Sequence, residues 1–207
     1  MNPTEYEHEP IRGLPGDLPP GERILWQGAP DWRTFARSAL HTRWIGLYFA
    51  LIAAVAAVGG SMGGMLAAVV SASAIFGLLS LFAVMVARTT VYTITNRRVV
   101  LRIGVALNTC VNLPLALIGS AELREQGAGF GDIALVPTAP HGLGYAMLWP
   151  HARPFRFSRA EPMLRAVPEA KAVADILALA CAAITRVSRE EMPARKSATL
   201  PSREVPA

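Results

Sequence analysis

The sequence predicts a membrane α+β protein: a two-helix transmembrane hairpin joined to a small antiparallel β sandwich or barrel, which a C-terminal amphipathic helix closes. Three observations predict this architecture. A run of 44 residues between Arg43 and Arg88 contains no Asp, Glu, Lys or Arg. From Tyr92 onward, apolar side chains recur at every second position, as they do in strands. Near the C-terminus the apolar spacing becomes that of a helix with one apolar face.

The uncharged run is too long for a single membrane-spanning helix. As one helix it would extend for about 66 Å, whereas the hydrocarbon core of a bilayer is about 30 Å thick. The run is interrupted at Gly59–Gly64, where four of six residues are glycines that disfavour a helix and favour a tight turn. We therefore expect a hairpin over residues 38–87, with spans at about 38–58 and 65–87.

The glycine cluster admits other interpretations. A phosphate-binding loop would need a preceding strand and a Lys-Ser/Thr ending, and the sequence has neither. Gly60 and Gly64 also have the small-xxx-small spacing of closely packed membrane helices. Close helix packing at these glycines is therefore an alternative to the turn.

Charges beside the run predict the orientation of the hairpin. A cleaved secretory signal is not expected, because the run is too long and follows a proline-rich polar leader of about 37 residues. Positive charge favours the cytoplasmic side of a membrane. The turn carries no charge, whereas arginines lie on both flanks: Arg33, Arg37, Arg43, Arg88, Arg97, Arg98 and Arg102. We expect both termini to be cytoplasmic.

Short strands are expected after the hairpin, within a cytoplasmic domain of residues 88–187. Two of them flank a polar turn at Thr95–Arg97. In the second strand, the apolar residues Val99, Leu101, Ile103 and Val105 would share one face. Further strands are expected at 109–113, 121–125, 132–136 and 144–149, separated by prolines and glycines.

The segment before the hairpin is expected to contribute to the same domain. Residues 1–21 read as a flexible leader, and residues 22–37 as a strand-like segment. We expect Ile24–Trp26 to join the later sheet, because Trp26 would otherwise be exposed.

An amphipathic helix is expected at about 168–187, packed on the sheet. Its apolar stripe comprises Val173, Ile176, Leu177, Ala180, Ile184 and Val187. A third membrane span is the alternative, but only ten uncharged residues separate Asp175 from Arg186, about half of what a span requires. Residues 188–207 are expected to be disordered.

The sequence contains no recognisable catalytic set, so we expect no enzyme, no cofactor and no metal site. The four histidines lack metal-ligand spacing, and no nucleophile elbow occurs. Cys110 and Cys181 are expected to be reduced, without a disulfide. The motif GAGFGD at 127–132 resembles a dinucleotide fingerprint, but a strand-like segment follows it instead of a helix. We expect a glycine-rich connection between strands there.

The segment LWPHARPFRF, Leu148–Phe157, is the densest candidate for a contact site. Trp149, His151, Arg153 and Phe155 interleave aromatic and basic side chains with two prolines, Pro150 and Pro154. Contact with a partner or lipid and a structural corner both remain open. Ligation of a haem by His151 is disfavoured, because the residue lies outside the expected spans.

Basic residues outnumber acidic ones in the expected cytoplasmic domain. Arg88 to Arg165 includes nine arginines and four acidic residues. Nucleic-acid binding is not expected, because no binding motif accompanies the charge. We expect Arg97, Arg98 and Arg102 to contact anionic membrane lipid.

Several segments, taken in order, resemble known families. Strands followed by one C-terminal helix beside a membrane hairpin resemble the bacterial pleckstrin-homology-like membrane proteins, and YTITNRRVVLRIGVAL (92–107) is general to them. Together with GERILWQGAPDW, NLPLALI, GFGDIAL, LWPHARPF and PMLRAVP, the chain from Ile11 to about Ile184 resembles the PuhB family of photosynthetic-complex assembly proteins from purple bacteria.

The resemblance implies a non-enzymatic factor of the bacterial inner (intracytoplasmic) membrane that helps to assemble the photosynthetic reaction centre and core antenna. Newly inserted subunits would pack on small residues of the spans and contact Trp149–Phe157. The small residues are Gly46, Ala50, Ala54, Ser73 and Gly77, which would also permit a homodimer. A general lipid-binding module, or an enzyme acting on a lipid or pigment, are the alternatives.

Overall fold

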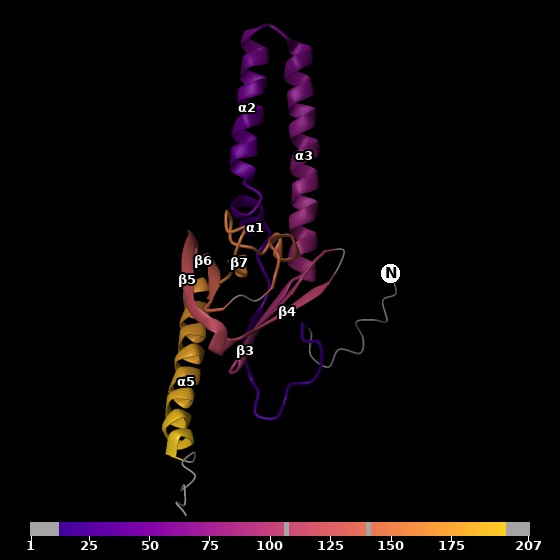
Figure 1. Ribbon diagram of the computed structural model, residues 1–207. Helices are drawn as coiled ribbons and strands as arrows, with labels where there is room; N and C mark the ends of the chain where they lie inside the picture. The colour runs from indigo at the N-terminus through magenta and orange to yellow at the C-terminus, as the bar shows by residue number, and fades with distance from the viewer. Residues whose placement is uncertain (1–12, 106–107, 140–141, 198–207) are drawn as a thin grey trace, which may run out of the picture.

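The computed structural model describes residues 13–105, 108–139 and 142–197, with side chains as far as Arg186. Two long helices, α2 (Thr42–Val58) and α3 (Met62–Thr89), project side by side from one end of a β domain (Figure 1). A third, α5 (Ala170–Ser197), packs on the domain and extends away from the opposite end. The molecule is thus an α+β structure with a helical hairpin.

The β domain consists of two antiparallel sheets, in the orders β1-β2-β3-β4 and β5-β6-β7. The first sheet is formed by β1 (Ile24–Gly28), β2 (Val91–Thr95), β3 (Arg98–Ile103) and β4 (Thr109–Pro114). The second is formed by β5 (Ile118–Gly127), β6 (Phe130–Pro137) and β7 (Met163–Val167). Short helices connect these elements: α1 (Trp32–Ser38), η2 (Leu115–Leu117) and α4 (Tyr145–Leu148).

The main hydrophobic core lies between the two sheets and α5. On β3, Val99, Leu101 and Ile103 are buried, as the alternating pattern predicts for one face of a strand. They belong to one cluster with Leu164 of β7 and Leu177 of α5. The sequence prediction of antiparallel strands closed by an amphipathic helix is confirmed.

The early strand joins the later sheet, as the exposed-tryptophan argument predicts. β1 pairs antiparallel with β2, which places Trp26 opposite Ile94. Trp26 is partly buried against the main core. Strands β2 and β3 pair around the predicted Thr95–Arg97 turn.

The segment before the hairpin differs from the strand-like prediction for residues 22–37. Trp32–Ser38 form helix α1, because the Asp31 carboxylate caps its N-terminus by accepting a hydrogen bond from the Thr34 N–H (2.8 Å). The chain then bends by 61° before α2, with His41 at a left-handed φ of 53°. The first hairpin helix therefore begins at Thr42 and not at residue 38.

The second hairpin helix is longer than the predicted range of 65–87. Ser61 caps α3 by accepting a hydrogen bond from the Gly64 N–H (3.1 Å), so Gly64 lies inside the helix and the turn shortens to Gly59–Ser61. In the part of the chain that the structure describes, α3 has the length and composition to cross a membrane by itself. Helices α1 and α2 meet that criterion only as a bent pair. Membrane crossing by both hairpin helices remains a proposal.

The hydropathy pattern of the sequence gave the wrong prediction for two elements near the second sheet, α4 and β7. The range 144–149 contains the short helix α4 instead of a strand, since Ala146, Met147 and Leu148 favour helix. Strand β7 is missing from the sequence prediction. All five of its residues are buried, including Arg165, so it lacks the alternation that marks a half-exposed strand.

The flexible leader predicted for residues 1–21 is partly packed. Residues 1–12 lie outside the described chain, but Leu14 is buried on the β domain. At Gly13 (φ 88°), an added Cβ would lie 2.6 Å from Cγ1 of Val91, so only glycine fits this approach. Gly13 and Leu14 therefore belong to the packed domain, whereas residues 15–21 are exposed or half-buried and the leader prediction for them stays a prediction.

The C-terminal helix is longer than the predicted 168–187. It begins at Ala170 and continues to Ser197, so the prediction of disorder from residue 188 is wrong as far as that residue. The added segment, residues 188–197, contains two Arg, two Glu, one Lys, one Ala and one Met, which favour a helix, and it continues through Pro193. Residues 198–207 lie outside the described chain.

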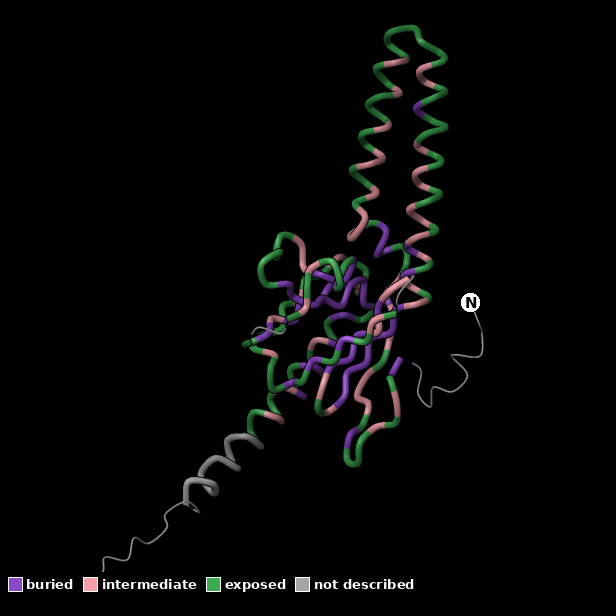
Figure 2. The backbone as a smooth tube through the Cα atoms, turned by 45° about the vertical axis from the view of Figure 1, so that its right-hand side comes forward, coloured by how far each residue is buried: buried purple, intermediate pink, exposed green. Residues whose placement is uncertain are grey.

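A second, smaller cluster joins the helical hairpin to the β domain. Phe35 and Ala36 of α1 pack against Ala83 and Val86 of α3 and against Ala166 of β7. The small alanine side chains let the three elements approach closely. Figure 2 shows that buried residues concentrate in the β domain, whereas α2 and α3 are mostly exposed or half-buried.

Candidate functional site

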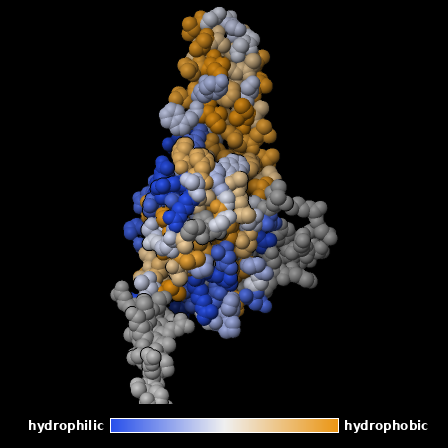
Figure 3. Space-filling view, viewed as in Figure 1, coloured by the Kyte–Doolittle hydropathy of each residue, from blue (hydrophilic) through white to orange (hydrophobic). Residues whose placement is uncertain are grey.

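An open cleft of about 1020 Å³ lies between the base of the helical hairpin and the second sheet. Residues of α1, the start of α2, strands β5 to β7 and the loop around Arg153 line it. On the sheet, Arg124 of β5 lies opposite Asp132 of β6. Hydrophilic residues gather on the β domain directly beneath the apolar hairpin (Figure 3). The cleft therefore sits where the apolar and polar parts of the molecule meet.

The lining of the cleft carries a surplus of positive charge. Its acidic residues are Glu122, Glu125 and Asp132, and its arginines are Arg37, Arg43, Arg124, Arg153 and Arg165. Arg153 forms ion pairs with Glu122 (2.8 Å) and Glu161 (3.0 Å), and these hydrogen bonds raise its pKa. Within the described residues, Arg37, Arg43 and Arg124 form no ion pair, although the Arg37 side chain donates hydrogen bonds to the Arg33 carbonyl (3.2 Å) and the Thr34 hydroxyl (3.5 Å).

Arg165 is the one buried arginine of the cleft lining, with 6 % of its surface exposed. Its Nη2 donates a hydrogen bond to the Ala152 carbonyl (2.9 Å), while its Nε has no partner in the described structure. Burial lowers the pKa of Arg165, and nearby Asp132 partly offsets this effect. A buried, incompletely bonded guanidinium is costly unless a further acceptor is supplied.

A second buried polar atom in the cleft lining also lacks a partner. It is the hydroxyl oxygen of Ser38, at the C-terminal end of α1. Within the described residues, Ser38 Oγ and Arg165 Nε are the two buried side-chain polar atoms without a hydrogen bond. Both belong to residues of this single cleft.

Asp132 has a structural partner that explains part of its burial. Its carboxylate accepts a hydrogen bond from the Ala166 N–H (2.8 Å) and another from Gln126 Nε2. Ala166 has a left-handed φ of 51°, next to a register shift between β6 and β7. The carboxylate thus stabilises an irregular strand, and Asp132 follows a glycine turn between strands, as expected for GAGFGD.

His151 does not form the surface contact predicted for it. It is fully buried and shares hydrogen bonds with the Tyr92 hydroxyl (2.7 Å) and the Thr90 hydroxyl (3.3 Å). Burial, with a smaller contribution from Arg165, lowers the pKa of His151 to about 3, so the imidazole is neutral at physiological pH. Burial raises the pKa of Tyr92. This network connects β2 to the loop before β7 and fits the structural-corner interpretation.

Trp149 and Phe155, which flank His151 in the sequence, are exposed, in contrast to the histidine. Trp149 stacks on Phe82 of α3 with ring centroids 5.6 Å apart, yet half of its surface is exposed. Phe155 is 88 % exposed and lines the cleft. The loop therefore presents aromatic side chains next to the base of the helical hairpin.

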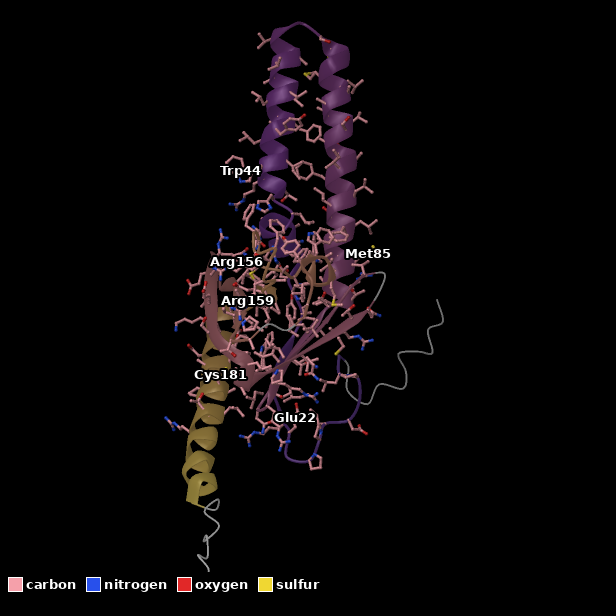
Figure 4. The ribbon with its side chains drawn as sticks, viewed as in Figure 1. Glu22, Trp44, Met85, Arg156, Arg159 and Cys181 are labelled. Atoms are coloured by element: carbon pink, nitrogen blue, oxygen red, sulfur yellow. The ribbon has the colours of Figure 1, made fainter. Side chains whose placement is uncertain are left out.

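The predicted lipid-contacting arginines occupy opposite ends of the first sheet. Arg98 forms an ion pair with Glu22 (2.7 Å). Burial acts to raise the pKa of Glu22, but the hydrogen bonds from Arg98 and Thr95 outweigh it, so the pKa is lowered overall. Glu22 lies at the end of the β domain remote from the hairpin (Figure 4). The prediction that Arg97 and Arg98 face head groups at the base of the hairpin is therefore wrong, because β2 carries the turn away from α3. Arg102, opposite Val91, lies at the near end.

The small residues predicted to pack helices divide into two groups. Gly46 faces the inside of the hairpin, where an added Cβ would lie 3.3 Å from Phe76. Ala50 and Ala54 of α2 and Ser73 and Gly77 of α3 are exposed on outer surfaces. Of these five described small residues, only Gly46 thus contributes to contact between the two hairpin helices.

Sequence reasoning identified Arg153 and Phe155 but missed the cleft that contains them. Arg37 and Arg43 were explained by topology alone, and Arg124 lies in a strand with no distinguishing motif. One usable signal was Arg165, a charged residue within the apolar run of β7. In the described residues, no group of three or more His, Cys, Asp or Glu side chains is arranged to hold a metal ion.

The β domain has relatives among known proteins. A family model described as "Bacterial PH domain" matches residues 45–180, and the chain belongs to that family. It is also 40 % identical over 193 residues to an uncharacterized 23.7 kDa protein in the puhA 5′ region of Rhodobacter capsulatus. The match covers 88 % of this chain and 90 % of that protein. No solved structure matches the chain.

Proposed function

We propose that this protein is a non-enzymatic inner-membrane factor of the PuhB family that assists assembly of the photosynthetic reaction centre and core antenna. The observation that carries the proposal is the relative from Rhodobacter capsulatus, which is similar along nearly its whole length and is named for a reaction-centre gene region. The sequence segments that resemble the PuhB family support the same assignment.

The proposal places α2 and α3 across the membrane. Large apolar side chains on the outside of this hairpin are more than half exposed, including Leu47, Leu51, Val55, Leu66, Val70, Leu78 and Leu81. Such a surface is unfavourable in water and marks a membrane or protein interface. Helix α3 extends for about 42 Å and α2 for about 26 Å. Seventeen residues, the length of α2, is near the lower limit for a span of about 30 Å of hydrocarbon.

The orientation of the hairpin follows from charges at its base. Arg33 and Arg37 precede α2, Arg43 lies in its first turn, Arg88 lies in the last turn of α3, and the connecting turn is uncharged. The positive-inside rule then puts the β domain and both termini in the cytoplasm.

Exposed small residues give the hairpin a way to hold newly inserted subunits. Ala50 and Ala54 lie on the outside of α2, and Ser73 and Gly77 on the outside of α3. Helices of reaction-centre or core-antenna subunits, or a second copy of this chain, can approach closely at such positions. Trp149 and Phe155 then offer aromatic contacts to the cytoplasmic portions of those subunits.

The first test is the near-infrared absorption spectrum of membranes from a strain lacking this protein, compared with its parent at matched growth. An assembly role predicts weak or slowly appearing reaction-centre and core-antenna bands, with total bacteriochlorophyll intact and both bands restored by the wild-type chain. Unchanged spectra would favour the alternative function, a lipid-binding module unrelated to photosynthesis. Loss of the pigment itself would point to an enzyme of pigment synthesis.

A further inference from the structure

We propose that the cleft binds the phosphate group of an anionic phospholipid from the membrane that holds the hairpin. The proposal rests on membrane crossing by α2 and α3 and specifies one partner of the β domain. It assigns a ligand to the cleft residues, of which Arg153 and Phe155 were predicted contact residues from the sequence.

The position of the cleft fits a lipid head group. Arg43 and Trp44 lie in the first turn of α2, the point at which the chain enters the apolar hairpin, and both line the cleft. Tryptophan is enriched at the level of lipid head groups. Figure 4 places Trp44 at the base of α2, with Arg156 and Arg159 on the adjacent part of the β domain. A lipid beside α2 would therefore bring its phosphate to the mouth of the cleft.

The charges of the cleft select an anion. Glu122 is compensated by Arg153, and Asp132 accepts hydrogen bonds from Ala166 and Gln126. Glu125 has no ion pair among the described residues, so five arginines of the lining stand against three carboxylates. Arg37 from the hairpin side and Arg124 from the sheet side remain without an ion pair among the described residues. Two cations on opposite walls are suited to contact one phosphate from two directions.

Two enclosed polar atoms that lack a hydrogen-bond partner in the described structure belong to residues of the cleft lining. Arg165 is nine-tenths buried and retains an unbonded Nε, and Ser38 retains an unbonded hydroxyl. Buried donors of this kind are normally satisfied by protein, water or ligand. Phosphate oxygens accept hydrogen bonds from both guanidinium and hydroxyl groups.

Lipid is favoured over an acidic peptide by the apolar residues beside the charges. Phe155 is almost fully exposed and lines the same cleft, and its neighbour Phe157 is two-thirds exposed. Aromatic side chains next to basic ones suit the membrane interface, where acyl chains and phosphates are adjacent. An acidic peptide would satisfy the arginines but leave these aromatic rings in water.

The test measures binding of short-chain phosphatidylglycerol, dihexanoyl-phosphatidylglycerol, to the full chain in a neutral detergent by titration calorimetry. Arg37→Gln and Arg124→Gln are the test variants, because both side chains are exposed and their loss leaves the core intact. Arg97→Gln is the matched control, an exposed arginine on the turn remote from the hairpin. We expect each test variant to weaken binding about fivefold, the double variant about 25-fold, and the control to bind like wild type.

Four outcomes would overturn the proposal. They are a double variant that binds like wild type, dihexanoyl-phosphatidylcholine that binds as tightly as the anionic lipid, inorganic phosphate that binds as tightly as the lipid, and an acidic peptide that binds through Arg124 while the lipid does not. The measurement needs no photosynthetic protein. A failure here therefore leaves the spectra of the deletion strain as an independent test of the assembly function.

Discussion

The helical hairpin and the β domain use the same apolar residue types in opposite ways. In β3, Val99 and Leu101 are completely buried, whereas Leu51 of α2 and Leu78 of α3 are each more than 60 % exposed. Water would penalise the second arrangement as strongly as it rewards the first. Apolar composition alone therefore does not distinguish a protein core from an exposed apolar surface.

Truncating one leucine in each region tests this difference in burial most directly. Leu101→Ala is expected to lower the free energy of unfolding by about 2 to 5 kcal/mol, because it leaves a cavity between the sheets and α5. Leu51→Ala is expected to change it by no more than about 0.5 kcal/mol, because its side chain faces the surroundings of the hairpin. Chemical denaturation in a mild detergent measures both. Equal losses would mean that α2 packs against protein.

A charged substitution on the hairpin tests whether its exposed apolar surface lies in a membrane. Leu78→Arg, near the middle of α3, is expected to raise the apparent free energy of membrane insertion by about 3 kcal/mol. Leu117→Arg, at another exposed leucine but in the β domain, is expected to leave insertion unchanged. A glycosylation-tag insertion assay compares the two. Normal insertion of the Leu78 variant would contradict membrane crossing by α3.

The buried polar network at His151 makes the β domain sensitive to acid. The pKa of His151 is about 3 in the folded state and near 6.5 in an unfolded chain, so the unfolded state binds more protons between these values. The free energy of unfolding should then fall as the pH drops below about 6.5, by up to about 1.4 kcal/mol per pH unit from this group. His151→Gln should remove that part of the slope.

Tyr92→Phe provides the control for this pH experiment. It deletes the hydroxyl that hydrogen-bonds to His151 but keeps the titrating imidazole. Stability should fall by about 1 to 3 kcal/mol while the acid slope is retained. Denaturation midpoints between pH 4 and 8 measure both effects. A wild-type slope in His151→Gln would assign the acid sensitivity to other groups.

Features that leave a clear pattern in neighbouring residues were predicted from the sequence, and other features were not. The β2–β3 hairpin, the alternation on β3 and the apolar stripe of α5 are local patterns, and they were read correctly. Strand β7 failed because a fully buried strand shows no alternation. Helix α1 was missed although its capping residue, Asp31, precedes it in the sequence. The apolar residues Ile24–Trp26 before it led instead to the prediction of a strand-like segment.

The cleft was beyond prediction for a different reason. Arg37, Arg124 and Arg165 lie on three elements that only the tertiary fold brings together, and no spacing in the sequence links them. The segment Trp149–Phe157 was recognised as unusual, but its residues separate by burial. His151 is enclosed while Phe155 is exposed, and a pattern of residue types carries no information on which of two neighbouring side chains turns inward.

The smallest expected effect on stability concerns Phe155, and it distinguishes a functional aromatic residue from a core one. Phe155→Ala should change the free energy of unfolding in detergent by no more than about 0.5 kcal/mol, because the ring is 88 % exposed. Phe35→Ala is the matched variant. Its ring is fully buried where α1 meets α3 and β7, and its loss should cost about 3 to 5 kcal/mol. If Phe155→Ala proved equally destabilising, the ring would belong to the fold. A near-neutral change would instead place Phe155 with the outer residues of α2 and α3, whose apolar side chains are covered by something other than this chain.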